Sequence, residues 1–250
     1  MTTAAQHLTS TPLAFDPEVC EANHILASDS DLSIDQLQAA EDRIHSFHYS
    51  LSKRVYDIVC SSTLIILLAP LCLAIALCIL FTSPGPILYT EKRIGRYGRA
   101  FTILKFRSMY TKEHLRSKMK VQIEDEHLFH LRTFAKSHGD FRTTPIGAIL
   151  RKWSLDELPQ LFNVLRGDMS LVGPRPVVAR EREMYGSLGV FYDMTIPGIS
   201  GLWQVSGRSD ITFNERVILD CTYATNWSIF LDIAILAKTL PAVLQKKGAY

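Results

Sequence analysis

The adjacent carboxylates Asp156 and Glu157 are the residues of this sequence best suited to chemistry. Ser154 precedes them in the pattern Ser-x-x-Glu, which is typical of a capping box and predicts a helix N-terminus. If Asp156 itself caps the helix, Pro159 falls in the first turn, where proline is tolerated. In both registers the backbone N–H groups and the helix dipole favour negative charge. We therefore expect ionised carboxylates that attack phosphorus or bind a divalent cation, although many capping boxes serve structure alone.

Two further segments carry polar groups on stiff or glycine-rich backbone. Arg175 stands between two prolines, and a planar guanidinium on a rigid loop suits phosphate binding. The segment 197–208 holds three glycines, which we expect to let a ligand approach the backbone closely. Within it, Trp203 and Gln204 are candidates for contacting a base or sugar, and Arg208 for binding phosphate. Each segment alone also fits an ordinary surface turn.

The apolar run 55–81 is long enough to anchor the chain in a membrane. A helix over these residues would extend for about 40 Å, against a hydrocarbon core of about 30 Å. Pro70, near the middle, removes a main-chain hydrogen bond and kinks the axis. Lysine and arginine flank both ends, whereas a crossing helix normally has them on one side. The residues alone leave two models open: a spanning helix, and a bent helix that enters one leaflet and returns.

Charge is distributed unevenly along the 250 residues. Residues 1–42 contain eight acidic residues and no lysine or arginine, so the remainder carries 27 basic side chains against 17 acidic ones. This predicts a mostly disordered acidic tail and a basic body that suits phosphates, anionic lipids or nucleic acid. The five cysteines form no CxxC pair, which favours a reducing compartment over a disulfide framework or a metal site.

The remaining pattern predicts few strands and several helices. Strands are expected at 87–90 and 101–106, and helices at 145–166, 177–185, 213–225 and 227–247. The last helix suits either the core or a membrane surface, with Trp227 as an interfacial anchor. The predicted fold class is therefore α/β: small and mostly helical, with few short strands, one membrane helix and interfacial amphipathic helices.

Several motifs, in order, resemble the bacterial sugar transferases, the monotopic polyprenyl-phosphate phosphoglycosyl transferases. These motifs are Lys105–Met109, Ser154–Gln160, Asn163–Val164, Gly167–Pro176 and Pro197–Arg208. The similarity runs from about Lys53 to Tyr250. The segment Gly201–Arg208 is most similar to exopolysaccharide-initiating members that transfer galactose or glucose phosphate to undecaprenyl phosphate.

The resemblance implies a two-step reaction. Asp156 matches the nucleophile that attacks the β-phosphate of a UDP-hexose, expels UMP and holds the sugar phosphate until undecaprenyl phosphate accepts it. Glu157 matches the neighbouring acid, which helps to hold Mg²⁺ or to move protons, so both carboxylates are candidate metal ligands. The candidate substrate- and phosphate-binding residues are Arg151, Arg175, Arg208, Lys105, Arg107 and Gln204.

The resemblance also implies a re-entrant helix and a catalytic domain on the cytoplasmic face of the bacterial inner membrane. The expected organisation is an acidic cytoplasmic tail over 1–52, a re-entrant helix over 53–83 kinked at Pro70, and a catalytic domain over 84–250. The chain departs from the family pattern at Ala69, where the family has serine, and at Ile196, where it has arginine. Expected partners are UDP-hexose, undecaprenyl phosphate, membrane lipids and other polysaccharide-assembly enzymes, but no nucleic acid.

Two other classes of function stay open on the sequence. A non-catalytic, membrane-anchored scaffold of a polysaccharide complex would keep the anchor but need no carboxylate pair. A nucleic-acid-binding module would use the basic body, but the sequence has no recognisable binding motif and this class leaves the apolar run unexplained.

Overall fold

The computed structural model describes residues 47–111, 114–115, 142–207 and 211–244. Over these residues the chain is mostly helical, with a few short strands and one long apolar helix, which confirms the predicted class. Most of the predicted acidic tail, and the candidate phosphate ligand Arg208, lie outside the described residues.

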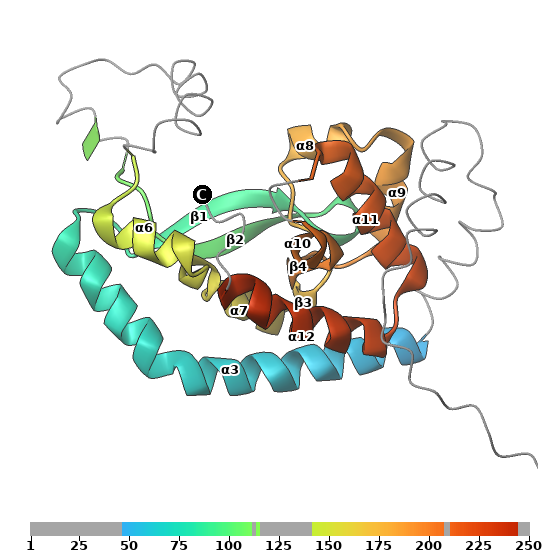
Figure 1. Ribbon diagram of the computed structural model, residues 1–250, viewed down its shortest axis with the longest axis horizontal. Coiled ribbons are helices and arrows are strands. Elements are labelled where there is room, and N and C mark those ends of the chain that lie inside the picture. The colour runs from blue at the N-terminus through green and yellow to red at the C-terminus, as the bar shows by residue number, and fades with distance from the viewer. Residues whose placement is uncertain (1–46, 112–113, 116–141, 208–210, 245–250) are drawn as a thin grey trace, which may run out of the picture.

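Helix α3 (Phe47–Thr82) runs along the lower edge of the molecule and bends partway along its length (Figure 1). Pro70 lies inside the helix and accounts for the bend, because proline removes a main-chain hydrogen bond and displaces the preceding turn. The most apolar 18-residue window within Leu51–Thr82 has a mean hydropathy of 3.1, and only 11% of that window is buried. Within the described ranges it is the one helix that is long and apolar enough to cross a membrane.

The first part of α3 is fixed to the folded body by its basic residues. Lys53 is buried and donates a hydrogen bond to Asp232 Oδ2 at 2.6 Å. Arg54 donates to the carbonyl oxygens of Val164 and Leu165, each at 2.6 Å. These two cations therefore bind protein groups rather than lipid heads, and the argument from flanking charge fails for this end of the helix.

The other end of α3 returns to the same body. Arg107 donates to the carbonyl oxygens of Ser83 and Pro84, each at 2.7 Å, and to the Ser83 hydroxyl at 2.9 Å. Carbonyl groups at a helix end lack partners within the helix, so Arg107 satisfies acceptors that would otherwise be buried without one. Both ends of the apolar helix thus contact one folded unit.

Strands β1 (Leu88–Ile94) and β2 (Ala100–Phe106) form an antiparallel hairpin. The first strand extends four residues beyond the predicted 87–90, through a charged segment that a two-stranded sheet can leave in solvent. Asn163 of helix α7 (Gln160–Arg166) joins this helix to the hairpin through two hydrogen bonds with β2. Its amide donates to the Thr102 carbonyl at 2.7 Å and accepts from the Leu104 N–H at 3.0 Å.

The single helix predicted over 145–166 is wrong. The structure has α6 (Pro145–Lys152), a 3-10 turn (Leu155–Glu157) and then α7. Ser154 separates them with a φ of 55°, a left-handed conformation that L-residues adopt at a cost of about 1–2 kcal/mol and that ends a right-handed helix.

The rest of the chain forms a second group of elements, in the centre and at the right of Figure 1. These are β3 (Ser170–Val172), α8 (Ala179–Glu183), α9 (Gly189–Met194), β4 (Gly198–Ser200), α10 (Leu202–Ser206), α11 (Phe213–Asn226) and α12 (Ile229–Leu244). Strands β3 and β4 pair in parallel, so the predicted glycine-rich loop over 197–208 is partly strand and helix. Trp227 is only 8% exposed and donates to Asp232 Oδ2, so of the two predicted alternatives this residue follows the core and not the interfacial anchor.

The glycines of this segment pack against protein backbone. A Cβ on Gly198 would lie 2.1 Å from the Gly173 nitrogen, and one on Gly201 would lie 2.3 Å from the Gly173 oxygen. Contacts under 3 Å do not occur between real Cβ atoms and backbone, so these two positions require glycine. Because these glycines have no side chain, their backbone packs directly against Gly173. The space that we expected a ligand to use is therefore filled by the protein's own backbone at these two positions.

Candidate active site

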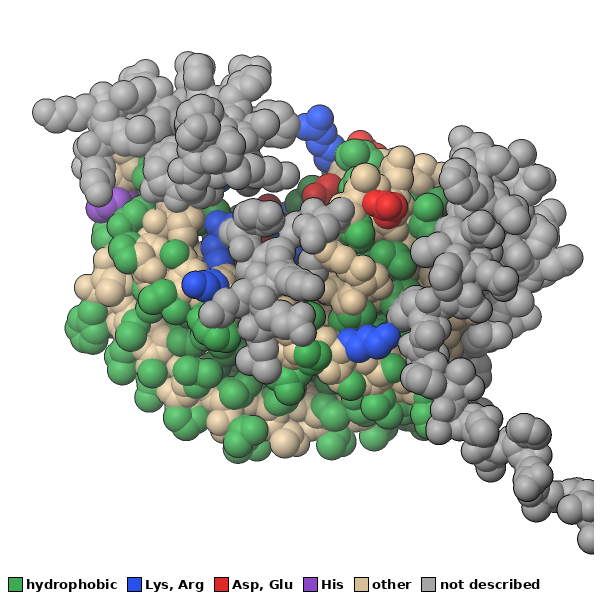
Figure 2. All heavy atoms as spheres, in the orientation of Figure 1, with side chains coloured by type: hydrophobic (Ala, Val, Ile, Leu, Met, Phe, Trp, Pro, Cys, Tyr) green, Lys and Arg blue, Asp and Glu red, His purple; other side chains and the backbone are tan. Residues whose placement is uncertain are grey.

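A pocket lies where the hairpin, the 3-10 turn, the loop after β3 and the start of β4 meet. Its lining residues are Arg93, Ile103, Lys105, Glu157, Gln160, Arg175, Pro176, Gly198, Ile199 and Gln204. Figure 2 shows basic and acidic side chains gathered around a hollow in the upper half of the molecule, away from the green apolar lower edge. The pocket is therefore a charged site that faces away from the long apolar helix.

The hairpin register places three of these side chains on one face of the sheet. Glu91 pairs with Ile103 and Tyr89 with Lys105, and alternate residues of a strand point to the same side. Arg93 thus shares a face with Ile103 and Lys105. Arg93 was not among the predicted site residues, because the strand predicted at 87–90 ends before it, whereas β1 extends to Ile94.

Glu157 is the carboxylate that enters the pocket. Lys105 donates to its Oε1 at 2.6 Å, and both side chains keep part of their exposure, 19% for lysine and 27% for glutamate. Burial favours the protonated acid, but the positive charges of Lys105 and Arg175 outweigh this effect and lower the pKa of Glu157. Glu157 is thus held as an anion by two cations from different elements.

The pKa of Asp156 is shifted in the opposite direction. Burial and the neighbouring charge of Glu157 raise its pKa, and the cations Lys105 and Arg151 offset only part of that rise. The predicted capping box is absent, since the Ser154 side chain makes no cap hydrogen bond and the acids lie in a 3-10 turn before α7. The argument that a helix N-terminus holds Asp156 ionised is therefore wrong, and its charge depends on nearby cations.

The predicted binding residues divide into three groups. Lys105, Arg175 and Gln204 line the pocket together with Glu157. Arg151 donates to the Thr143 hydroxyl at 3.3 Å and acts on Asp156 through its charge, whereas Arg107 is occupied at the end of α3. Sequence reasoning missed Arg93 and Gln160, the latter a hydrogen-bond partner of Glu157 from the first turn of α7.

The carboxylate pair fits a magnesium ion. Among the residues that the structure describes, His, Cys, Asp and Glu side chains form no group of three that would make a closed metal cage. Mg²⁺ commonly takes one or two carboxylates and completes its shell with water and substrate phosphates. Burial and, after it, the negative charge of Glu157 raise the pKa of Asp156, and a divalent cation held between the two carboxylates would relieve their repulsion.

Comparison with known proteins agrees with this site. The family model described as "Bacterial sugar transferase" matches residues 48–246. The chain is 44% identical over 200 residues to the exopolysaccharide production protein ExoY of Rhizobium meliloti, covering 80% of this chain and 88% of ExoY.

Longer relatives match over a similar region. The undecaprenyl-phosphate galactose phosphotransferase of Salmonella typhimurium is 46% identical over 204 residues, or 79% of this chain and 41% of that protein. The UDP-glucose:undecaprenyl-phosphate glucose-1-phosphate transferase of Caulobacter vibrioides is 39% identical over 208 residues, or 80% of this chain and 72% of that protein. Given this match over four-fifths of its length, the chain belongs to the bacterial sugar transferase family.

Proposed function

We propose that this protein transfers hexose-1-phosphate, with galactose or glucose as the hexose, from a UDP-sugar to undecaprenyl phosphate and so initiates exopolysaccharide biosynthesis. The observation that carries the proposal is the pocket in which Lys105 and Arg175 surround Glu157, directly beside Asp156. The names of the relatives from Salmonella typhimurium and Caulobacter vibrioides support the substrates.

The proposed first step forms a covalent intermediate on Asp156. A carboxylate oxygen of Asp156 attacks the β-phosphorus of the UDP-sugar, the bond from this phosphorus to the bridging oxygen breaks, and UMP leaves with the electron pair. In the second step a phosphate oxygen of undecaprenyl phosphate attacks the same phosphorus and releases the Asp156 carboxylate. Both steps displace a group at an anionic phosphate, so Lys105 and Arg175 stabilise the charge that accumulates.

Asp156 and Glu157 are the residues that would hold Mg²⁺, the expected cofactor. When bound, the ion neutralises diphosphate charge as UMP leaves. Glu157 already receives a hydrogen bond from Lys105 at Oε1, which orients the carboxylate. Arg151 contributes positive charge near Asp156 and so favours the anion that must attack.

The apolar surface supports attachment to a membrane. Large exposed apolar residues of α3 include Leu64, Ile66, Leu67, Leu71, Leu73, Leu77, Leu80 and Phe81, and those of α12 include Phe230, Ile233 and Leu240. Burying one such side chain stabilises by roughly 1.5–3 kcal/mol, so a row of them is costly in water. Because both ends of α3 contact one body, we propose that the helix enters the inner membrane from the cytoplasmic side and returns.

Cysteine labelling tests this topology. Ser30→Cys and Ala100→Cys, each in a variant whose native cysteines are replaced, report the two sides of the apolar helix. The re-entrant arrangement predicts that an impermeant reagent reaches both positions from the cytoplasmic face of inverted vesicles. Labelling from opposite faces would instead indicate a spanning helix.

The reaction is tested by measuring UMP release in membranes that contain undecaprenyl phosphate, across a panel of UDP-sugars. The proposal predicts release with UDP-galactose or UDP-glucose, together with a labelled phosphosugar adduct on the protein. Asp156→Asn should abolish both signals, whereas Glu183→Gln, which changes an exposed carboxylate of α8, should leave them unchanged. Normal turnover of Asp156→Asn would remove the nucleophile assignment, and no release with any sugar would favour a scaffold.

A further inference from the structure

Arg175, which lines the pocket with Glu157, also contacts the ring of Trp203. Its guanidinium carbon lies 5.3 Å from the centre of the Trp203 ring, within the range of a cation–π interaction. Arg216 of α11 lies 5.4 Å from the centre of the same ring. The Trp203 indole therefore contacts both guanidinium groups. Because the two positive charges repel each other, the arrangement needs a negative charge nearby to compensate for them.

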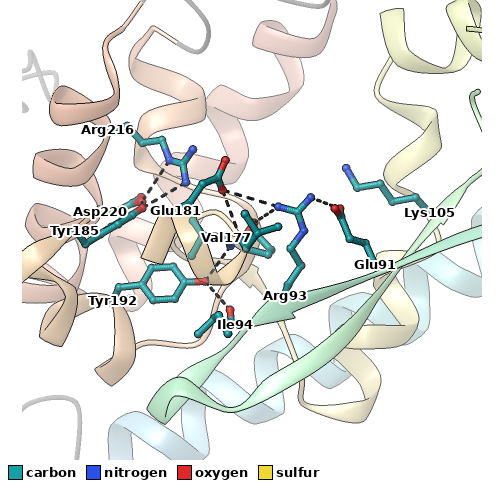
Figure 3. Close-up of polar contacts among 12 residues, drawn as sticks. Glu91, Arg93, Ile94, Lys105, Val177, Glu181, Tyr185, Tyr192, Arg216 and Asp220 are labelled. Carbon is teal, nitrogen blue, oxygen red and sulfur yellow. Dashed lines mark hydrogen bonds and ion pairs between the residues drawn. The ribbon is translucent and has the colours of Figure 1, made fainter. Parts of the chain in front are cut away.

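Asp220 supplies that charge from inside the molecule. It is 2% exposed, accepts a hydrogen bond from the Tyr185 hydroxyl at 2.8 Å and lies 3.9 Å from Arg216 Nε (Figure 3). The positive charges of Arg216 and Arg175 both act on this carboxylate. Arg175 is thus placed between two acids, Glu157 in the pocket and Asp220 behind it.

The cluster is poorly explained as a device for stability. A buried carboxylate loses its hydration, and Asp220 Oδ1 has no hydrogen-bond partner in the part of the chain that the structure describes. Trp203 Nε1 is likewise buried and without a hydrogen-bond partner among these residues. Apolar side chains of similar volume would fill this space at lower cost. What the charges achieve is a fixed position for the one guanidinium that extends from this cluster to the pocket.

We propose that Trp203, Arg216 and Asp220 are positioning residues that hold the Arg175 guanidinium over the pocket, where it binds the diphosphate of the nucleotide sugar. Trp203 provides the surface on which Arg175 rests, and Asp220 balances the charge of Arg216 so that both cations can share the ring. Trp203 thereby acts on the substrate through Arg175 and does not contact a base or sugar itself. This inference rests on the proposed function for the role of Arg175.

A double-mutant cycle tests the proposal, because a residue that acts through Arg175 has no effect once Arg175 is removed. The variants are Asp220→Asn, Arg175→Gln and the two combined, assayed for UMP release in membranes and for binding of UDP by calorimetry. We expect Asp220→Asn to lower kcat/KM and UDP affinity roughly tenfold. In the Arg175→Gln background the same substitution should change neither quantity further. Equal losses in both backgrounds would overturn the proposal.

A second series separates positioning from folding. Trp203→Phe keeps an aromatic ring and should retain more activity than Trp203→Leu, with the two melting at similar temperatures. The matched control is Asp193→Asn, which breaks another carboxylate–arginine pair of the same region, with Arg182 at 2.6 Å, but does not contact Arg175. It should leave kcat/KM unchanged, and a loss as large as that of Asp220→Asn would overturn the proposal.

The two proposals fail in distinguishable ways. If the wild-type protein releases no UMP, the proposed reaction is wrong, but the coupling between positions 175 and 220 is still measured through UDP binding. If the wild-type protein is active and Asp220→Asn matches it in kcat/KM and in UDP affinity, only the positioning role is wrong.

Discussion

Lys105 Nζ lies 2.6 Å from Glu157 Oε1, and this ion pair joins strand β2 to the turn that carries the adjacent acid Asp156. The strand and the turn are 52 residues apart in the sequence. Their approach separates the acidities of two neighbouring carboxylates: the cations lower the pKa of Glu157, whereas burial and the charge of Glu157 raise that of Asp156. One acid is thereby fixed as an anion while the other remains sensitive to its surroundings.

Replacing Lys105 should shift the pH dependence of the reaction. Its charge lowers the pKa of both Asp156 and Glu157, so Lys105→Met raises both values, and the acidic limb of the kcat/KM profile should move up by about one pH unit. Lys92→Met, at an exposed position on the same hairpin, is the control and should leave the limb in place. If the acidic limb of the kcat/KM profile stays in place in Lys105→Met, neither Asp156 nor Glu157 controls that limb.

Arg107→Gln should affect stability more than chemistry. The substitution leaves the carbonyls of Ser83 and Pro84 with weaker partners in a buried region, at a cost of about 2–4 kcal/mol in the free energy of unfolding. The activity of the folded fraction should be close to wild type, because the guanidinium serves the end of α3. Thermal unfolding in detergent and UMP release in the same preparation measure both quantities. Wild-type stability with lost activity would restore the predicted phosphate-binding role.

Lys53→Met should strongly destabilise the junction of α3 with α12. Lys53 is 3% exposed and Asp232 is fully buried, so removing the cation leaves an unpaired charge at a cost of about 3–5 kcal/mol. The double variant Lys53→Met/Asp232→Asn should recover part of the loss, since the amide stays neutral and still accepts a hydrogen bond from Tyr223. Chemical unfolding of the detergent-solubilised protein measures both, and a double variant less stable than the single one would contradict this account.

Asp220→Asn should make the stability of the protein depend less on pH. Burial, opposed in part by Arg216, raises the pKa of Asp220 from its ordinary 3.8 to about 7. Between these values the folded state binds more protons than the unfolded state, so the wild-type free energy of unfolding falls as the pH rises, in total by an amount on the order of 4 kcal/mol. The asparagine does not titrate, so the difference in melting temperature between variant and wild type should shift in favour of the variant as the pH rises from 5 to 8. Melting temperatures of the two proteins that fall in parallel between pH 5 and pH 8 would contradict this expectation.

Much of the architecture could be predicted because it depends on local sequence. The apolar run with Pro70 predicted a long bent helix, and the basic turn predicted the hairpin, since apolar length, proline and turn residues act over a few neighbours. The motifs around Glu157 and Arg175 identified two residues that meet in the pocket. Arg93 was missed because its strand is longer than its apolar residues suggested.

Other predictions failed where the partner of a side chain is distant in sequence. Ser154 matches a capping box, but its left-handed backbone rules out that geometry, and the adjacent acids are paired from the hairpin instead. Arg107 was predicted to bind phosphate, and in the structure its guanidinium contacts the end of α3, so that role stays a prediction. Trp227 looked like a membrane anchor, but Asp232 accepts its indole N–H inside the protein.

The sequence by itself determined the apolar anchor, the carboxylate pair and the family to which they belong, since residue type and spacing are sufficient for these. The tertiary structure alone decided which charges face one another. Lys53 meets Asp232 across 179 positions, and Lys105 meets Glu157 across 52. The energy of a charge depends on its distance from other charges and on its removal from water, and both are properties of the packed chain. For that reason the acidities of Asp156, Glu157 and Asp220 could be assigned only after folding placed their partners.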